Sequence, residues 1–461
     1  MAKITQRSDS ADISDLEDIE PPFDTYLRGK YKKSFAYATI KDRLPVILTK
    51  VIDTLSRNKD EIFKTHGAQA VEEIKQVVGG ISKLKNELVT NKAILPLIVM
   101  SNRDNDDAQI WNDKIEKLTE ERQETQLWFN TIWLICECYM YRRIAQEFFL
   151  TEHLKAYDPF SIQKEESFFK AKGSFSHLSK YVLNLIDTKN DHNIAEQEKF
   201  LINLIKLNLW GNKCDLSLST GNVDSQNDNP LNLLESLDSD ILIDNSNEVW
   251  RLLCKNVQCK TNNNSIVDIV LDNAGYELFT DLCLAIFLME NKLANKIRFY
   301  VKRYPWFVSD VTTCDFHWLV EMIKTSDDEN IQRFGQVCDK YLKDKSWTIE
   351  EESFWTEPFD YSEMKSSNPS LYNKLSEAVL VIFKGDLNYR KLMGDVNWKY
   401  TTDFCEALRG FRPTNLLSLR TVKADVCVGL PAGKAEELKK EIPNWMEIGK
   451  FGLIQASIEI Q

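Results

Sequence analysis

Two nearly unbroken apolar runs in the second half of the chain constrain the fold most. Residues 266–271 (IVDIVL) and 378–383 (AVLVIF) are rich in apolar residues and alternate little between apolar and polar positions. Such runs are typical of strands that are buried on both faces of a sheet. A helical pattern follows each run, so the sequence predicts strands that alternate with helices. This alternation favours right-handed crossovers and a mostly parallel sheet.

Shorter apolar segments extend the same pattern along the C-terminal half. They predict further strands at 297–301, 416–419, 425–429 and 452–456, with helices at about 274–290, 314–323 and 329–343. The predicted fold class is therefore α/β, with a three-layer α/β/α domain whose sheet is mostly parallel.

The first half of the chain predicts an all-helical domain. Apolar residues recur every four positions from Ile47 to Leu55, as on the buried face of a helix. The pair Gly79-Gly80 predicts an interruption of a second helical pattern. The most apolar long stretch, 128–150, contains Glu137, Arg142 and Arg143, so we interpret it as a buried helix rather than a membrane span.

These patterns divide the chain into three parts. Residues 1–32 are predicted to be a disordered, acidic tail, since their first twenty residues are polar. Residues 33–210 form the predicted helical domain, and residues 211–461 the predicted α/β domain. Within the latter, residues 216–246 are rich in Ser, Asn and Asp and are predicted to be a loop or linker.

Composition narrows the classes of partner. The net charge is −12, which argues against nucleic acid as the main partner, because phosphate backbones bind to clustered cations. The ten cysteines form no C-x-x-C pair, which predicts reduced thiols of an intracellular protein and no structural zinc. The first twenty residues contain no apolar signal segment, so the predicted compartment is the cytoplasm, with nuclear access left open, and no membrane contact is expected.

Polar and charged residues follow four of the predicted strands. In open α/β sheets, ligands bind beyond the carboxyl ends of the strands, so these residues are candidates for one shared site. In chain order they are Asp272 and Asn273, then Asp310, then Asp386, Asn388 and Arg390, and finally Arg420 and Lys423.

The residue types at these positions suit a metal ion and a phosphate group. Asp272, Asn273 and Asp310 offer only oxygen donors, which Mg²⁺ or Mn²⁺ prefers. Arg420 and Lys423 are suited to phosphate oxygens, arginine through its fork and lysine as a point charge. Simpler interpretations stay open at this point. They are a helix N-cap for Asp272-Asn273, a solvated surface pair for Arg420 and Lys423, and turn residues for Asp386 and Asn388.

Other catalytic and nucleotide-binding motifs are absent from the sequence. It contains no G-x-x-x-x-G-K-[ST], no G-x-G-x-x-G and no G-x-S-x-G. His317 stands between aromatic residues in a helical stretch, and we interpret it as a packed core histidine rather than a catalytic base.

Six segments together resemble one known family. They are FAYATIKDRLPVIL near residue 35, WGNKCDLS at 210–217, LDNAGYELFTDL at 271–282, VKRYPWFVSDV at 301–311, FKGDLNYRKLMGD at 383–395 and LRTVKADVCVGL at 419–430. In these segments the chain is similar to the damage-control metal-phosphatases, in the eukaryotic acidic-residue-methyltransferase branch, for which the Arg-Thr-x-Lys element at 420–423 is a marker.

The resemblance implies a site and an activity. It implies that Asp272, Asn273 and Asp310 bind Mn²⁺, with Ni²⁺, Co²⁺ or Mg²⁺ as substitutes. It implies substrate contacts from Asp386, Leu387, Asn388, Tyr389, Arg390 and Lys423, with Asn212 and Asp215 facing the cleft. The expected reaction is hydrolysis of small phosphorylated metabolites, including fructose 1-phosphate and fructose 6-phosphate.

Two mechanisms and two other functions stay open. Hydrolysis by an activated water and an aspartyl-phosphate intermediate at Asp272 both fit the sequence. By the same resemblance, Glu277 and Asp310 would contact S-adenosyl-L-methionine in a methyltransferase that acts on protein carboxylates. A third hypothesis is a non-enzymatic interaction protein whose helical half is the binding surface.

Overall fold

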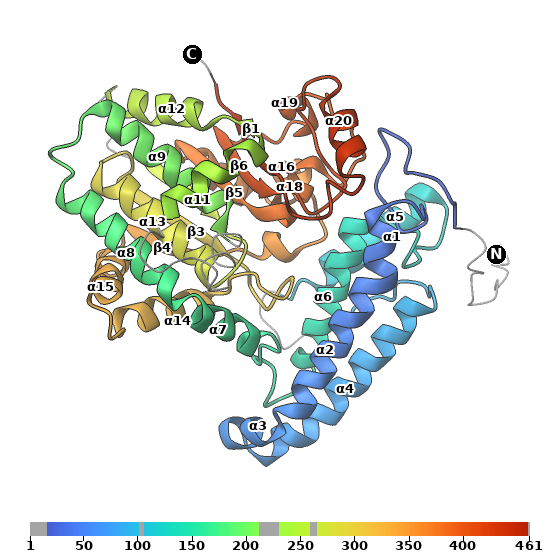
Figure 1. Cartoon of the computed structure of the whole chain (residues 1–461). Helices are drawn as coiled ribbons and strands as arrows, with labels where there is room; N and C mark the ends of the chain where they lie inside the picture. The colour runs from blue at the N-terminus through green and yellow to red at the C-terminus, as the bar shows by residue number, and fades with distance from the viewer. Residues whose placement is uncertain (1–15, 101–105, 212–229, 259–264, 460–461) are drawn as a thin grey trace, which may run out of the picture.

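The C-terminal half is built on a seven-stranded sheet in the order β1-β7-β6-β5-β2-β3-β4. The computed structural model describes residues 16–100, 106–211, 230–258 and 265–459 (Figure 1). The strands are β1 (Ile241–Asp244), β2 (Ile266–Val270), β3 (Lys296–Val301), β4 (Trp347–Glu351), β5 (Leu380–Lys384), β6 (Leu416–Thr421) and β7 (Gly452–Ser457). All neighbouring strands are parallel except β6 and β7, so the predicted mostly parallel α/β sheet is confirmed.

Three strand predictions differ from the structure. Residues 425–429 form no strand, and β1 and β4 were not predicted. Strand β1 lies within the stretch 216–246 that composition assigned to a loop, and β4 has the polar sequence WTIEE. Both are edge strands with one neighbour each, and such strands need no continuous apolar run.

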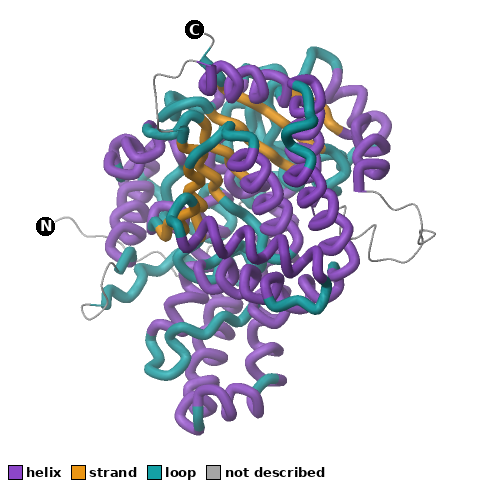
Figure 2. The backbone as a smooth tube through the Cα atoms, turned by 90° about the vertical axis from the view of Figure 1, so that its left-hand side faces the viewer, coloured by secondary structure: helices purple, strands orange, loops and turns teal. Residues whose placement is uncertain are grey.

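Each face of the sheet has its own apolar core, because side chains alternate along a strand. One core takes Val267 and Ile269 of β2, and the other takes Ile266 and Val270. The first is covered by α8 (Lys172–Asp187), α9 (Ile194–Leu209), α12 (Ser246–Gln258), α13 (Tyr276–Glu290), α14 (Thr313–Lys324) and α15 (Glu329–Lys343). The second contains residues of α16 (Met364–Ser367), α17 (Pro369–Ser376), α18 (Gly385–Met393), α19 (Phe404–Ala407) and α20 (Lys434–Glu441). Figure 2 shows the strands enclosed between helices.

The N-terminal helices continue the second core. They are α1 (Phe35–Ala38), the π-helix η2 (Thr39–Arg43), α2 (Leu44–Arg57), α3 (Lys59–His66), α4 (Ala68–Val89), α5 (Ala108–Arg122) and α6 (Trp133–Phe149). They form the lobe at the lower right of Figure 1. Helix α4 runs unbroken through Gly79-Gly80, so the predicted interruption is wrong. A Cβ at Gly80 would lie 1.9 Å from Glu147 Oε2, which explains why a small residue stands there.

Helix α6 joins the two halves. Every residue from Trp133 to Phe148 is buried, as expected for this apolar stretch. Three of its charged residues are paired inside the protein: Glu137 Oε2 lies 2.6 Å from Arg390, Arg142 Nε lies 2.7 Å from Asp107, and Arg143 lies 3.2 Å from Glu87. No helix in the described part of the chain is long and apolar enough to span a membrane.

The helices that precede residue 210 pack on both halves. Helix α7 (Ser161–Lys170) follows the N-terminal lobe, and α8 and α9 pack against α13 in the core of the α/β part. The division into domains at residue 210 stays a prediction.

The order of the strands fixes where a ligand can enter. From β2 the chain moves outward to β3 and β4, and it then returns to β5 on the other side of β2. The carboxyl ends of β2 and β5 therefore flank a topological switch point, where doubly wound sheets open a crevice for ligands.

Candidate active site

A cavity of about 470 Å³ lies at this switch point. Its wall combines residues from the ends of β2, β3, β5 and β6 with residues of α6 and α7. Some of the lining residues were predicted from the sequence, and others were not. Nine of them are Asp272, Asn273, Glu277, Asp310, Lys384, Asp386, Leu387, Arg390 and Lys423.

Backbone hydrogen bonds bring the three predicted metal ligands together. Asp272 and Asn273 follow β2, and Asp310 ends the loop after β3. Val311 N donates to Asp272 O at 2.7 Å, and Asn273 pairs with Asp310 in an isolated antiparallel bridge. The prediction that residues at separate strand ends meet at one edge is therefore supported by the fold.

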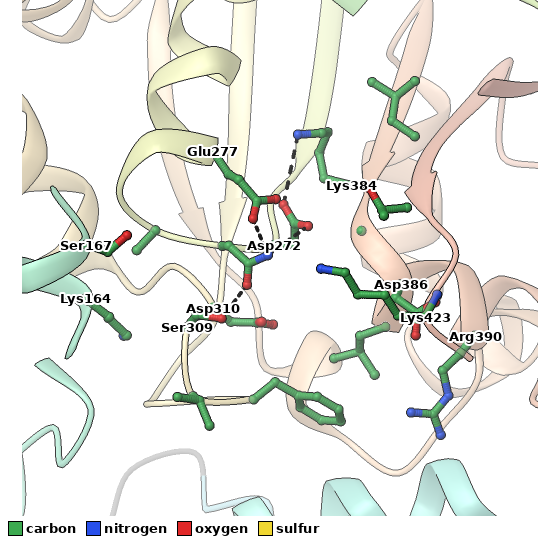
Figure 3. Close-up of a pocket in the computed structure, with 18 of the residues that line it drawn as sticks. Lys164, Ser167, Asp272, Glu277, Ser309, Asp310, Lys384, Asp386, Arg390 and Lys423 are labelled. Carbon is green, nitrogen blue, oxygen red and sulfur yellow. Dashed lines mark hydrogen bonds and ion pairs between the residues drawn. The ribbon is translucent and has the colours of Figure 1, made fainter. Parts of the chain in front are cut away.

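The side chain of Asn273 is held by two neighbours. Its Oδ1 accepts a hydrogen bond from Ser309 Oγ at 2.5 Å, and its Nδ2 donates to Glu277 Oε1 at 3.0 Å. The amide oxygen keeps a second lone pair for a further partner. Figure 3 shows Asp272, Glu277 and Asp310 on one side of the cavity, with Asp386, Lys423 and Arg390 on the other.

Two buried lysines accompany the carboxylates. Lys302 Nζ lies 3.2 Å from Asp310 Oδ2, and Lys384 Nζ lies 4.0 Å from Asp272 Oδ1 and 2.7 Å from Asp281. Both lysines are 1% exposed. They lie at the ends of β3 and β5, next to residues that the sequence had singled out. A strand-end position was the one signal that could have identified them as part of the site.

The donor set fits a hard divalent cation. Asp272 Oδ1 is buried and accepts no hydrogen bond from the described residues. Burial raises the pKa of Asp310 to about 6, the nearby charge of Asp272 adds to this shift, and burial raises the pKa of Glu277 as well. A bound cation would reduce the repulsion between these neighbouring carboxylates. Among the described residues, no three His, Cys, Asp or Glu side chains form a metal-binding group, so Asn273 or non-protein oxygens must complete the coordination.

The opposite wall begins at Gly385, the first residue of α18, which follows β5 directly. Gly385 has φ +84°, and a Cβ there would lie 2.1 Å from Asp272 Oδ2. Only glycine therefore lets the start of α18 approach the carboxylate of Asp272. The first turn of α18 carries Asp386 and Leu387 into the cavity wall, and the first N–H groups of a helix have no partner within the helix.

Three other predicted substrate residues lie behind this wall. Asn388 Oδ1 accepts from Tyr361, and Tyr389 donates to Gln455 at 2.9 Å. Arg420 is fully buried: its Nε donates to Asp386 at 2.7 Å, and its other nitrogens donate to Val426 O and Ala424 O. Its guanidinium group stands 4.2 Å over the ring of Tyr389. Arg420 therefore holds Asp386 and the loop after β6 in place. Its own guanidinium group lies out of reach of the cavity.

Arg390 lines the cavity but is already engaged. It forms two hydrogen bonds of 2.8 Å with Asp395, lies 2.6 Å from Glu137, and stands 3.6 Å over the ring of Trp133. Lys423 is the predicted cation whose ammonium group has no ion pair within the described residues.

The helical half closes the cavity on the side of α7. Lys164 is buried and lies 2.7 Å from Asp315 and 2.9 Å from Asp158, so it ties α7 to the start of α14. Ser167, Lys170 and Arg43 also line the wall. Sequence reasoning missed these residues, since nothing in the sequence indicates how the two halves pack together.

The remaining predictions are placed as follows. Asn212 and Asp215 lie outside the described residues, but a Cβ at the preceding Gly211 would come within 3.0 Å of Glu277 Cγ. Glu277 and Asp310, implied as contacts for S-adenosyl-L-methionine, line the same cavity, and that role stays a prediction. His317 is exposed and does not line the cavity, so its interpretation as a core residue is wrong.

Comparison with known proteins shows which family the chain resembles. The family model described as the damage-control phosphatase ARMT1-like domain matches residues 39–438. The chain is 44% identical over 433 residues to damage-control phosphatase ARMT1 of Mus musculus, covering 93% of this chain and 98% of the relative. It is 43% identical to the proteins of the same name from Danio rerio and Homo sapiens, covering 94% and 93% of this chain and 96% and 97% of theirs.

Proposed function

Because the chain belongs to the damage-control phosphatase ARMT1-like family, we propose that its cavity hydrolyses small phosphorylated metabolites with the help of a divalent metal ion. The observation that carries the proposal is the arrangement at the switch point. Oxygen donors at the ends of β2 and β3 face the start of α18 and Lys423 across one cavity. Fructose 1-phosphate and fructose 6-phosphate are the proposed first substrates, and Mn²⁺ is the proposed ion, with Ni²⁺, Co²⁺ or Mg²⁺ as substitutes.

Asp272, Asn273 and Asp310 would hold the ion. A bound divalent ion would polarise the phosphoryl group and activate a water molecule. The protein residues supply the rest. Lys384 and Lys302 lie beside the two carboxylates and help to hold them in place, and Glu277 fixes the orientation of the Asn273 amide.

The far wall would bind the phosphoryl group. Backbone N–H groups at the start of α18 attract anions, and Lys423 adds a positive charge. The start of α18 is preorganised, since Asp386 is held by Arg420 and Gly385 allows close approach to Asp272. Charge that develops on the phosphoryl oxygens is stabilised best by groups fixed in advance in this way.

The test is phosphate release from a panel of phosphoesters by metal-stripped protein, with and without Mn²⁺. We expect release only with metal, and a loss of about a hundredfold or more in kcat/KM for Asp272→Asn. Asp187→Asn is the matched control, because Asp187 is an exposed partner of Arg333 far from the cavity. Release that is independent of metal, or an Asp272→Asn enzyme as active as Asp187→Asn, would overturn the proposal.

A further inference from the structure

A second hollow opens directly into the candidate active site. Its volume is about 940 Å³, and we call it the outer groove. It lies between the faces of α2 and α7 and the loop at 307–309. Seven residues line both spaces, so the groove continues the inner cavity: Phe35, Arg43, Gln163, Glu166, Phe307, Val308 and Ser309.

The floor of the outer groove is apolar. Ile47, Val51 and Phe160 are buried beneath it, while Val46 and Ile162 stay 53% and 39% exposed on its two sides. Exposed apolar residues in the lining of a groove beside an active site mark a surface whose burial by a ligand would be favourable.

Some charged side chains of the outer groove have an ion-pair partner, and others have none among the described residues. Asp53 pairs with Arg57, and Glu166 pairs with Lys170 at the mouth. Arg43 and Lys50 form no ion pair among the described residues, against one unpaired acid, Asp42. Arg43 and Lys50 are seven residues apart, two turns along one side of the helical segment that leads away from the cavity. This side therefore offers an anion one positive charge at the junction with the inner cavity, Arg43, and a second one further out, Lys50.

A strained turn forms the wall at the junction. Phe307 and Val308 both have positive φ, 44° and 71°, which is a real outlier for a β-branched residue. Ser309 N donates to Phe307 O at 2.9 Å, and Asp310 N donates to Trp306 O at 3.1 Å. The ring of Phe307 stacks on Tyr141 at 4.6 Å. These contacts hold two apolar side chains at the junction, directly before the candidate ligand Asp310, and such strain is concentrated where a site needs it.

We propose that the outer groove is the subsite for the leaving group of the substrate. The preferred substrate is an elongated phosphomonoester with an apolar body and a second anionic group at its far end. The inner cavity then holds the phosphoryl group, and the groove covers the remainder. This inference rests on the proposed phosphatase function and specifies the class of substrate.

The experiment compares two series of substrates with the Mn²⁺-loaded full-length enzyme. One series consists of n-alkyl phosphates, and the other of ω-carboxyalkyl phosphates, both with chains of two to ten carbons. We expect kcat/KM to rise with chain length by up to about threefold per methylene until the groove is filled. The carboxylate should add about a further tenfold once the chain reaches Arg43 or Lys50.

Two variants locate the effect. Val46→Asp should flatten the rise in the alkyl series, and Lys50→Gln, at a residue that lines only the outer groove, should reduce the preference for the terminal carboxylate. Neither should change kcat/KM for the two-carbon ester by more than about twofold. Val89→Asp is the matched control, since Val89 is 51% exposed on α4, away from both spaces.

The outcomes separate the two proposals. A flat or falling series, or a Val46→Asp enzyme that follows Val89→Asp at every chain length, would overturn the leaving-group subsite while hydrolysis of short esters upholds the phosphatase. No hydrolysis of any ester with any metal would overturn the proposed function itself.

Discussion

The carboxyl ends of β2 and β6 look alike in the sequence, where each ends an apolar run with polar residues suited to a phosphate site. The structure uses them differently. After β2, Asp272 and Asn273 leave the sheet and enter the cavity. At β6, pairing with antiparallel β7 continues to Arg420 and Thr421, two residues beyond the predicted strand.

Because β6 extends to Thr421, Arg420 belongs to the strand, and its side chain does not enter the cavity. Along a strand, alternate side chains face opposite sides, so Arg420 faces the same side as Leu416, toward the core that contains Tyr389. Lys423, three residues later, has left the strand and reaches the cavity. A position at the end of a strand thus predicts near which edge of the sheet a residue lies. Whether its side chain enters the site depends on whether the strand pairing continues by one more residue.

Arg420→Leu should give the largest effect and should act on stability. It leaves Asp386 without its partner and two buried carbonyl groups without donors, which costs about 3–5 kcal/mol of unfolding free energy. Urea unfolding measures this loss. A variant of unchanged stability with much weaker substrate binding would instead mean that Arg420 contacts the substrate.

Asp310→Asn tests the β2–β3 side of the comparison, where function should suffer most, although buried Lys302 also loses its charged partner. We expect kcat/KM to fall by about 10²–10³-fold and the affinity for Mn²⁺ to drop by at least about tenfold. Electron paramagnetic resonance of Mn²⁺ and phosphate release measure the two effects. Full metal affinity in this variant would contradict the proposed ligand set.

Lys423→Met should have a smaller effect, confined to binding. Lys423 has no ion pair to lose in the described structure, so stability should change by less than about 0.5 kcal/mol. Loss of its charge should raise KM for phosphoesters about tenfold. Initial rates over a range of substrate concentrations, beside thermal melts, separate this outcome from the stability loss expected for Arg420→Leu.

Val308→Gly should give the smallest effect of the four variants, and it should raise stability rather than lower it. Glycine accepts φ of 71° without strain, so unfolding free energy should rise by about 1 kcal/mol despite the added chain entropy. Loss of the side chain at the junction should raise KM several-fold for long esters only. Destabilisation of the variant would show that the turn is not strained.

The sequence predicted the centre of the fold better than its edges. Strands β2, β3, β5, β6 and β7 were found because they are buried and apolar, whereas the edge strands β1 and β4 are short and partly polar. The predicted break at Gly79-Gly80 failed because a glycine can also serve close packing, here against Glu147.

The site was predictable to a similar degree. Asp272, Asn273, Asp310 and Lys423 reach the cavity as expected from their strand ends. The wall from the helical half could not be predicted. Lys164 and Arg43 belong to helices whose sequences resemble other amphipathic helices, and their place at the cavity depends on tertiary packing.

The complete burial of α6 has a consequence for how the molecule opens. Its ion pair with Arg390 and its apolar contacts span both halves, so neither half can separate while the helix stays folded. Amide protons along α6 should therefore exchange with deuterated solvent only through global unfolding, as slowly as those of β2 and β5. Heating should accordingly melt the helical lobe and the sheet in one calorimetric transition, so the catalytic residues and their covering wall are lost together.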